Sequence, residues 1–364
     1  MKKIEAVGSN RSDSRRSFMK RGIVAAGAAA AGAGLMPRAL SASNRQPEGD
    51  RLTRGDSAIL RLLAAAEIIE ADLWQQYEEL GGVNAAPSGY TAGLQQLDGD
   101  MPQYISDNTD DENSHVHFLN AYLESKGEQP VNFDQFRTLP GSQASGAQPI
   151  GRLTNLMQLA VDTSWWTRYR SRKNPDLGAR FAQAVPTLSM GQHPAIPRND
   201  AELGDPNNVS NHVQAIANTA GFHFGFIEQA GTSLYATLSQ RVTSLEVLRI
   251  TLSIGGSEIM HFQTWHDKAG NAVALTDGDL TFPDLAHSHD ETLQANLIMP
   301  EPCDFISKEL PRCAIVRPTG RGQIDAIGAI TGFIADGLFI GQKKEFVQLL
   351  LNMAAEADEA RRGL

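Results

Sequence analysis

The chain has 364 residues, of which 41% are hydrophobic and 20% are charged. This composition is typical of a folded globular protein, and it excludes collagen-like, intrinsically disordered and multi-span membrane proteins. Residues 1–43 hold 8 of the 32 basic side chains but only 2 of the 42 acidic ones, so the remainder carries 24 basic and 40 acidic groups. Because such an acidic surface repels phosphate backbones, we expect no binding to nucleic acid.

The first 43 residues have the layout of a cleaved export signal. Arg15 and Arg16 precede Phe18, an uncharged stretch rich in Ala and Gly covers residues 22–36, and small residues surround Ala42. The apolar stretch is too short for a stable membrane span, so we expect no transmembrane anchor in the mature protein. The paired arginines resemble the twin-arginine (Tat) signal. This resemblance implies that the Tat export machinery is a partner and that the protein is periplasmic or extracellular.

The chain has only two cysteines, Cys303 and Cys313. It therefore has neither a CxxC zinc site nor a disulfide framework. In an oxidising compartment these two side chains could form one disulfide that closes a small loop. The sequence leaves open whether they do.

From residue 56 onward the hydrophobic pattern is helical with almost no alternation of period two, so we predict an all-α fold. A polar linker covers residues 44–55, and six helical stretches follow it. They cover residues 56–80, 101–126, 150–173, 208–240, 244–268 and 323–362. Gly81 and Gly127 are expected to end the first two stretches, and Thr243 is expected to open a capping box before the fifth.

Two long segments lie outside the four bundle helices of this prediction. Residues 127–207 are rich in Pro, Gly and Gln and contain one helical island with Trp165 and Trp166, which indicates a crossover connection. Residues 269–364 form a C-terminal extension with a polar loop and an apolar run over residues 326–340. We expect this run to form a packing helix, and it could also serve as an interface in a homo-oligomer.

Four of the predicted helices carry ionisable side chains in the middle of an apolar stripe. The stripes follow steps of three and four residues, which place their members on one helix face. The ionisable members are Glu67 and Glu70 in the first helix, Glu112 and His115 in the second, Glu228 in the third, and Glu258 and His261 in the fourth. An unpaired carboxylate in a protein core costs several kcal/mol, so four at one level of a bundle require a compensating cation.

The spacing of these residues indicates a pair of metal ions. A Glu and a His that are three residues apart lie on one helix face and can ligate the same ion. Glu112 and His115 have this spacing, as do Glu258 and His261. Two such helices and two that each donate a Glu make up the ligand set of di-iron and di-manganese carboxylate bundles. Oxygen-rich ligands with two imidazoles favour iron or manganese over copper.

Four short segments carry these residues together with flanking aromatic side chains. They are Glu67–Trp74, Asp111–Leu119, Ile227–Tyr235 and Glu258–His261. Over residues 56–268 the chain resembles the ferritin-like domain of Tat-exported bacterial proteins and of desiccation-associated proteins. The resemblance implies a ferritin-like four-helix bundle with a di-metal centre. The chain pattern adds a long crossover and additional C-terminal helices, and the donor set favours two Fe or two Mn ions. It favours Glu67 over Glu70 as a ligand, while both remain candidates.

Other interpretations exist at single positions. Glu112 could belong to a capping box that begins at Thr109, with the helix starting late. Glu228 could be an exposed acid. His115 and His261 could be core histidines that bond to the backbone.

The residues support two hypotheses of function. The first is an exported di-metal oxidoreductase of the oxidase, ferroxidase or catalase type that acts on O2 or peroxide. The second is a non-catalytic stress- or desiccation-associated bundle that has a structural or metal-binding role. The ligand set fits both hypotheses, because catalysis also needs an open coordination position.

Overall fold

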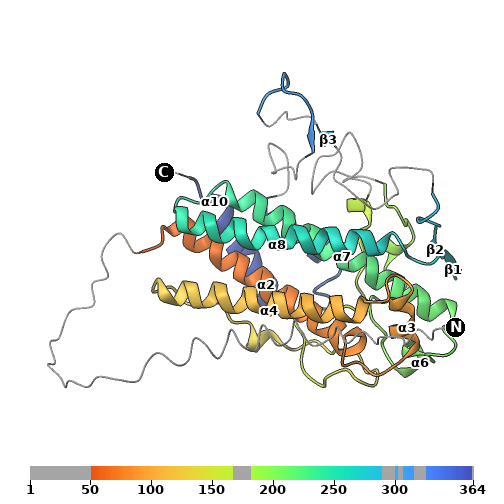
Figure 1. The fold of residues 1–364 in the computed structure, drawn as a ribbon. Helices are drawn as coiled ribbons and strands as arrows, with labels where there is room; N and C mark the ends of the chain where they lie inside the picture. Colours follow the sequence, from red (N-terminus) through yellow and green to blue (C-terminus); the bar gives the residue numbers. More distant parts are fainter. Residues whose placement is uncertain (1–50, 167–181, 289–299, 302–305, 315–324, 363–364) are drawn as a thin grey trace, which may run out of the picture. The chain divides into compact units, whose positions relative to one another are not determined.

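Four long helices lie side by side and contribute much of the hydrophobic core (Figure 1). They are α2 (Arg54–Gly81), α4 (Met101–Ser125), α7 (Asn211–Ser239) and α8 (Leu245–Ala269). Helix α2 packs against α4, and α7 packs against α8. Each helix begins and ends within three residues of a predicted stretch, so the predicted all-α bundle is confirmed.

The structure, a computed structural model, describes residues 51–166, 182–288, 300–301, 306–314 and 325–362. The predicted export signal over residues 1–43 and the Cys303 side chain of the candidate disulfide lie outside the described residues. Among the helices of the described part, none combines the length and the apolar character that a membrane span requires.

Side chains cap the first turns of three bundle helices, α2, α7 and α8. At the start of α2 the Thr53 hydroxyl accepts a hydrogen bond of 3.0 Å from the Asp56 amide. At α8 the cap is Ser244, which accepts from the Glu246 amide at 3.2 Å, so the predicted capping box at Thr243 is wrong by one residue. The amides of Thr243 and Ser244 donate instead to the Asp56 carboxylate, at 2.8 and 3.0 Å. This contact joins the start of α2 to the turn before α8.

The crossover is mostly irregular where it is described. Its short helical turns are η1 (Asp134–Phe136), η2 (Leu188–Met190) and α6 (Asp200–Leu203). The helix predicted for residues 150–173 is wrong over residues 150–163, which form no helix. The amides of Leu153 and Thr154 donate to the buried Asp72 carboxylate of α2, both at 3.0 Å. Because this carboxylate satisfies them, the segment is buried without needing helical hydrogen bonds.

The C-terminal extension contains two helices where the sequence predicted one over residues 323–362. They are α9 (Ala326–Ala335) and α10 (Lys344–Glu359). Gly337 and Gly341 separate them with φ angles of 85° and 87°, a left-handed conformation that favours glycine and ends a helix. Helix α10 packs against α2 and α9. Its Asp358 carboxylate accepts hydrogen bonds from the first two amides of α9 and from Arg241.

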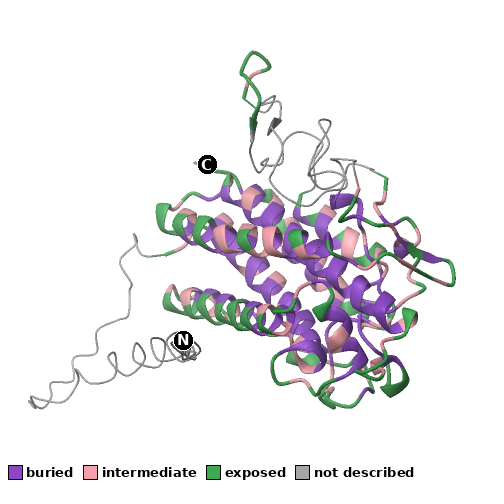
Figure 2. Ribbon diagram, turned by 45° about the vertical axis from the view of Figure 1, so that its right-hand side comes forward, coloured by how far each residue is buried: buried purple, intermediate pink, exposed green. Residues whose placement is uncertain are grey.

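The remaining elements are short. Helix α3 (Gly89–Gln95) packs against α7. After α8, β1 (Leu275–Asp277) and β2 (Leu280–Phe282) form an antiparallel hairpin, and β3 (Pro300–Glu301) pairs antiparallel with β4 (Cys313–Ala314). Strands of two or three residues are too short for a period-two pattern, so the sequence did not predict them. Figure 2 shows that the buried residues line the inner faces of the long helices.

Candidate metal centre

Each bundle helix directs a carboxylate into the core. Glu67 of α2, Glu112 of α4, Glu228 of α7 and Glu258 of α8 are at most 1% exposed. The alternative that Glu228 is a surface acid is therefore wrong. Glu112 lies inside α4, and the Thr109 hydroxyl bonds to a carbonyl one turn earlier, so a late helix start at Thr109 is also wrong.

One group of donor atoms surrounds His115. Nδ1 of this ring lies 3.0 Å from Glu112 Oε2. It also lies 3.3 Å from Glu67 Oε2 and 3.4 Å from Glu258 Oε1. The four side chains each offer a donor atom within 4.8 Å of the others. Helices α2, α4 and α8 thus bring together three oxygens and one nitrogen that a single cation could contact.

A second group surrounds His261. Nδ1 of this ring lies 3.0 Å from Glu112 Oε1 and 3.3 Å from Glu228 Oε2. Glu258 completes the group, again with donor atoms within 4.8 Å of one another. Glu112 therefore offers Oε2 to the first group and Oε1 to the second, and the imidazole rings are 6.2 Å apart. Two neighbouring cations that share Glu112 and Glu258 fit this arrangement.

The protein itself satisfies these donor atoms poorly. Within the described part of the chain, buried atoms that lie close to other donor atoms but form no well-aligned hydrogen bond include Glu67 Oε2, Glu228 Oε2, both carboxylate oxygens of Glu258, and Nδ1 of His261. Folded proteins normally avoid such atoms, because each loses its hydration without a replacement. Since these atoms belong to the two donor groups, bound cations would compensate for the lost hydration.

Neutral side chains orient the carboxylates. Asn108 donates to Glu112 Oε1 and to Glu228 Oε1, both at 2.9 Å. The Asn108 oxygen in turn accepts from the Trp265 indole at 2.7 Å, which fixes the orientation of the amide. The indole of Trp265 stacks on Trp74, with ring centroids 5.1 Å apart, and both rings are at most 1% exposed. An apolar wall therefore bounds the centre behind Asn108.

The outer nitrogens of the two histidines have different partners. Nε2 of His115 lies 3.1 Å from the Ser257 hydroxyl, and Nε2 of His261 lies 3.1 Å from Asp111 Oδ2. The Ser257 hydroxyl donates its hydrogen to a backbone carbonyl at 2.7 Å, so it accepts from Nε2. Both rings thus carry a hydrogen on Nε2, and Nδ1 faces the carboxylates.

Burial and neighbouring charges set the protonation of this cluster in the absence of a cation. Burial raises the pKa of Glu67 to about 7, and hydrogen bonds with His115 and Tyr235 offset only part of this increase. Burial and the other carboxylates raise the pKa of Glu258 well above its usual value. Burial disfavours a charged His115, but hydrogen bonds with Glu112 and Glu67 outweigh it and raise the pKa to about 10. A bound cation would therefore displace protons.

Two glycines leave room beside the ligands. A Cβ at Gly231 would lie 2.1 Å from Glu258 Oε2, so any other residue would push this carboxylate out of its place. A Cβ at Gly255 would lie 2.8 Å from the Cβ of Tyr235, so glycine here allows close packing of α7 and α8.

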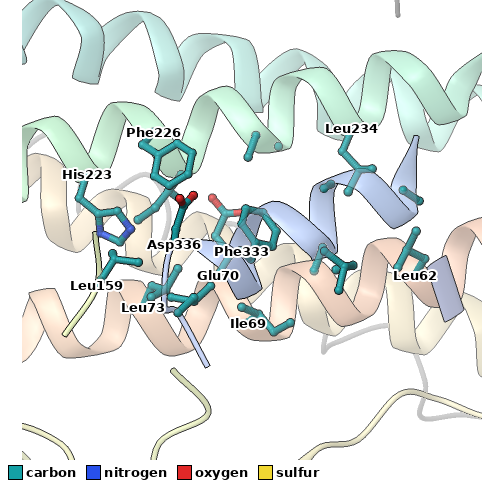
Figure 3. Close-up of a pocket in the computed structure, with 18 residues that line it drawn as sticks. Leu62, Ile69, Glu70, Leu73, Leu159, His223, Phe226, Leu234, Phe333 and Asp336 are labelled. Carbon is teal, nitrogen blue, oxygen red and sulfur yellow. The ribbon is translucent and has the colours of Figure 1, made fainter. Parts of the chain in front are cut away.

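Glu70 lies one turn after Glu67 but outside both donor groups. It is 8% exposed, and burial raises its pKa well above the usual value, which favours the protonated form of the carboxyl group. Figure 3 shows Glu70 at the wall of an apolar cavity of about 50 Å³ that lies between α2, α7 and α9. Leu73, Phe226 and Phe333 are among its lining side chains. The structure thus brings Glu67 to the donor atoms and Glu70 to the cavity.

Sequence reasoning missed the residues that position the ligands. Asn108 and Tyr235 lie on the same stripes as Glu112 and Glu228, so the stripe pattern could have indicated them. The Tyr235 hydroxyl donates to Glu67 Oε1. By contrast, Asp111 and Ser257 lie off the stripes, and only the packing of α4 beside α8 brings them to the histidines.

Comparison with known families agrees with this geometry. The family model of the ferritin-like domain matches residues 55–270. This range covers the four bundle helices and the crossover. No curated protein and no solved structure matches the chain. The match covers more than half of the chain and contains all of the donor residues in the two groups. The chain therefore belongs to the ferritin-like domain family.

Proposed function

We propose that this chain is an exported protein that binds two Fe or two Mn ions and carries out redox chemistry on O2 or peroxide, as an oxidase, ferroxidase or catalase. The observation that carries the proposal is that two donor groups share Glu112 and Glu258. Shared carboxylates support a coupled pair of ions rather than two independent sites. Carboxylate oxygens with two imidazoles suit iron and manganese.

Each ion would have two ligands of its own. Glu67 and His115 would hold one ion, Glu228 and His261 would hold the other, and the two shared carboxylates would bridge them. When bound, a pair of redox-active ions supplies or accepts two electrons. The hydrogen bonds from Nε2 of His115 and His261 to Ser257 and Asp111 keep Nδ1 of each ring available as a ligand.

The cavity beside Glu70 supports a small oxidant as the substrate. Its volume of about 50 Å³ exceeds the roughly 10–15 Å³ that one water molecule needs and is well below the roughly 150 Å³ of an apolar cavity that binds benzene. A diatomic or triatomic molecule fits such a space, whereas an aromatic ring does not. The lining is mainly apolar, which favours O2, and the protonated Glu70 carboxyl can donate a proton to a molecule held there.

The first 43 residues support export by the Tat pathway, and hence a periplasmic or extracellular location. Replacing Arg15 and Arg16 by lysine should leave the protein in the cytoplasm, as measured by fractionation of cells that express the full chain. Export of this variant at the wild-type level would exclude the Tat route.

Metal analysis and turnover of the purified mature protein test the central proposal. We expect two Fe or Mn ions per chain, together with O2 consumption in the presence of Fe(II) or disproportionation of peroxide. The variant Glu258→Gln should lose both metal and turnover. The control His117→Gln, which changes an exposed histidine of α4, should keep both.

Two outcomes would change the conclusion. If the wild-type protein binds neither Fe nor Mn above background, the di-metal proposal is wrong. If it binds two ions but leaves Fe(II), O2 and peroxide untouched, the function is the alternative one, a non-catalytic stress- or desiccation-associated bundle that binds metal.

A further inference from the structure

A separate set of metal-ligating side chains lies at the start of α7. His212 is the second residue of this helix, Asp277 is the last residue of β1, and His193 belongs to the irregular segment before α6. His212 precedes Glu228 by 16 residues on the same helix, which corresponds to about 24 Å along the helix axis. This set is therefore too far from the candidate metal centre to be part of it.

The three side chains converge on one carboxylate oxygen. Asp277 Oδ2 lies 2.6 Å from His212 Nδ1 and 2.8 Å from His193 Nε2. Each side chain offers a donor atom within 4.8 Å of the others, and the two imidazole rings are 5.7 Å apart. Neighbouring ligand atoms of a tetrahedral transition-metal ion are about 3.4 Å apart when the bonds to the ion are about 2.1 Å long. A single ion could therefore contact all three side chains after only a small outward shift.

The ring nitrogen of His212 that points away from Asp277 faces a carboxylate. Its Nε2 lies 3.7 Å from Glu202 Oε1. Glu202 is buried, and hydrogen bonds of 2.8 and 3.0 Å from Arg198 Nε fix its position. A carboxylate behind an imidazole is the common partner of a metal-ligating histidine, because it orients the ring and makes it more basic.

The fold does not need this set as a structural clamp. The Ser210 hydroxyl already caps α7 by accepting from the Val213 amide at 3.2 Å. The β1–β2 hairpin is already joined to α7, because the Asn211 side chain contacts the Thr276 carbonyl at 3.5 Å. Neither the capping of α7 nor the attachment of the hairpin therefore requires the two histidines and the aspartate.

The set is partly exposed to solvent, most of all at His212. The His193 side chain is 10% exposed, Asp277 is 25% exposed and His212 is 42% exposed. The exposure of His212 gives an ion access from solvent. A site with three protein ligands leaves a coordination position for water or another small ligand.

We propose that His193, His212 and Asp277 bind one divalent first-row transition-metal ion, for which Zn²⁺ is the best-matched probe. Two imidazoles and one carboxylate are a donor set that suits Zn²⁺. This site is independent of the proposed redox function, because it shares no residue with the candidate metal centre.

The test compares Zn²⁺ binding by the wild-type mature protein with binding by Asp277→Asn and His193→Gln. Equilibrium dialysis with Zn²⁺ as the only metal gives the number of ions per chain. We expect each variant to bind one ion fewer than the wild type, whatever the occupancy of the candidate metal centre. The control His117→Gln should bind as many ions as the wild type. The difference between proteins is the readout, so failure of the di-metal proposal does not affect it.

A second measurement needs no variant. Crystals of the wild-type protein soaked in Zn²⁺ should show an anomalous difference peak at the zinc edge between His193, His212 and Asp277. Equal Zn²⁺ content in wild type and Asp277→Asn, or the absence of a peak at these three side chains, would overturn the proposal.

Discussion

The two halves of the candidate metal centre have the same kinds of ligand but different supports. In one half the outer nitrogen of His115 bonds to the Ser257 hydroxyl, whereas in the other half that of His261 bonds to the Asp111 carboxylate. A carboxylate makes an imidazole a stronger donor than a hydroxyl does. The second half should therefore hold its ion more tightly than the first.

The two carboxylates that each belong to one half only, Glu67 and Glu228, also have different hydrogen-bond donors. Glu67 accepts a hydrogen bond from the Tyr235 hydroxyl, and Glu228 accepts one from the Asn108 amide. Asn108 also bonds to Glu112, so it links the second half to a shared ligand. Tyr235 makes no corresponding link among the hydrogen bonds of the described residues.

The largest expected effect comes from removing a ligand that both halves share. In an Asp277→Asn background, which removes the separate site at the start of α7, the variant Glu258→Gln should lower metal content from two ions per chain to none, measured by elemental analysis after dialysis. The control Glu124→Gln, an exposed acid near the end of α4, should keep two ions. Retention of one tightly bound ion by Glu258→Gln, with an unchanged circular dichroism spectrum, would mean that the halves are independent.

Removing a ligand of one half should have an intermediate effect. We expect Glu67→Gln to lower metal content from two ions to one, because only the half around His115 loses an oxygen donor. Glu70→Gln is the matched comparison one turn away, and it should keep two ions while its turnover falls, because the carboxyl at the cavity is lost. If Glu70→Gln instead binds one ion and Glu67→Gln binds two, then Glu70 is the ligand.

Changing the residues that bond to Nε2 of the two histidines should reveal the difference in affinity between the two halves. Asp111→Asn should weaken binding of one ion by about 10- to 100-fold, the usual effect of removing such a partner. Ser257→Ala should weaken the other ion by less than about tenfold, because a hydroxyl contributes less than a carboxylate. Competition titration with a chelator measures both affinities. Equal losses would refute the inequality between the halves.

The smallest expected effect is the pH dependence of stability without metal. The pKa of Glu67 rises from 4.5 to about 7 in the folded chain, and that of His115 rises from 6.5 to about 10. The folded state then binds more protons than the unfolded state, so stability falls as pH rises from about 4.5 to 10.

Melting temperatures in the presence of a chelator should therefore decrease between pH 5 and pH 9. Metal-loaded protein should show tighter metal binding as pH rises over the same range, because the ions displace protons. A chelated protein whose melting temperature increases from pH 5 to pH 9 would contradict these pKa shifts.

The bundle and most of its donor residues could be predicted because both follow from one pattern. Apolar stripes with a period near 3.6 residues define the helix faces, and acids in such stripes are costly unless they are paired. The same pattern placed Glu67 and Glu70 on one stripe. Only the rotation of α2 against α4 and α8 separates Glu67, which reaches His115, from Glu70, which reaches the cavity.

Other features depend on contacts that no local pattern records. Residues 150–163 have enough apolar side chains for a helix, but their amides bond to distant groups instead. The amides of Leu153 and Thr154 donate to the Asp72 carboxylate, and that of Asn155 donates to the Leu338 carbonyl. The set of His193, His212 and Asp277 comes from three segments with no regular spacing, so only the tertiary structure brings it together.

The helix that follows the bundle gives the cavity its outer wall. The family match ends at residue 270, yet Ile330 and Phe333 of α9 and Asp336 after it line the space beside Glu70. This segment contributes no donor atom to the candidate metal centre, yet it bounds the cavity beside Glu70. Under the proposed function, exchange of this segment alone should alter which oxidant reaches Glu70 while leaving the two donor groups unchanged.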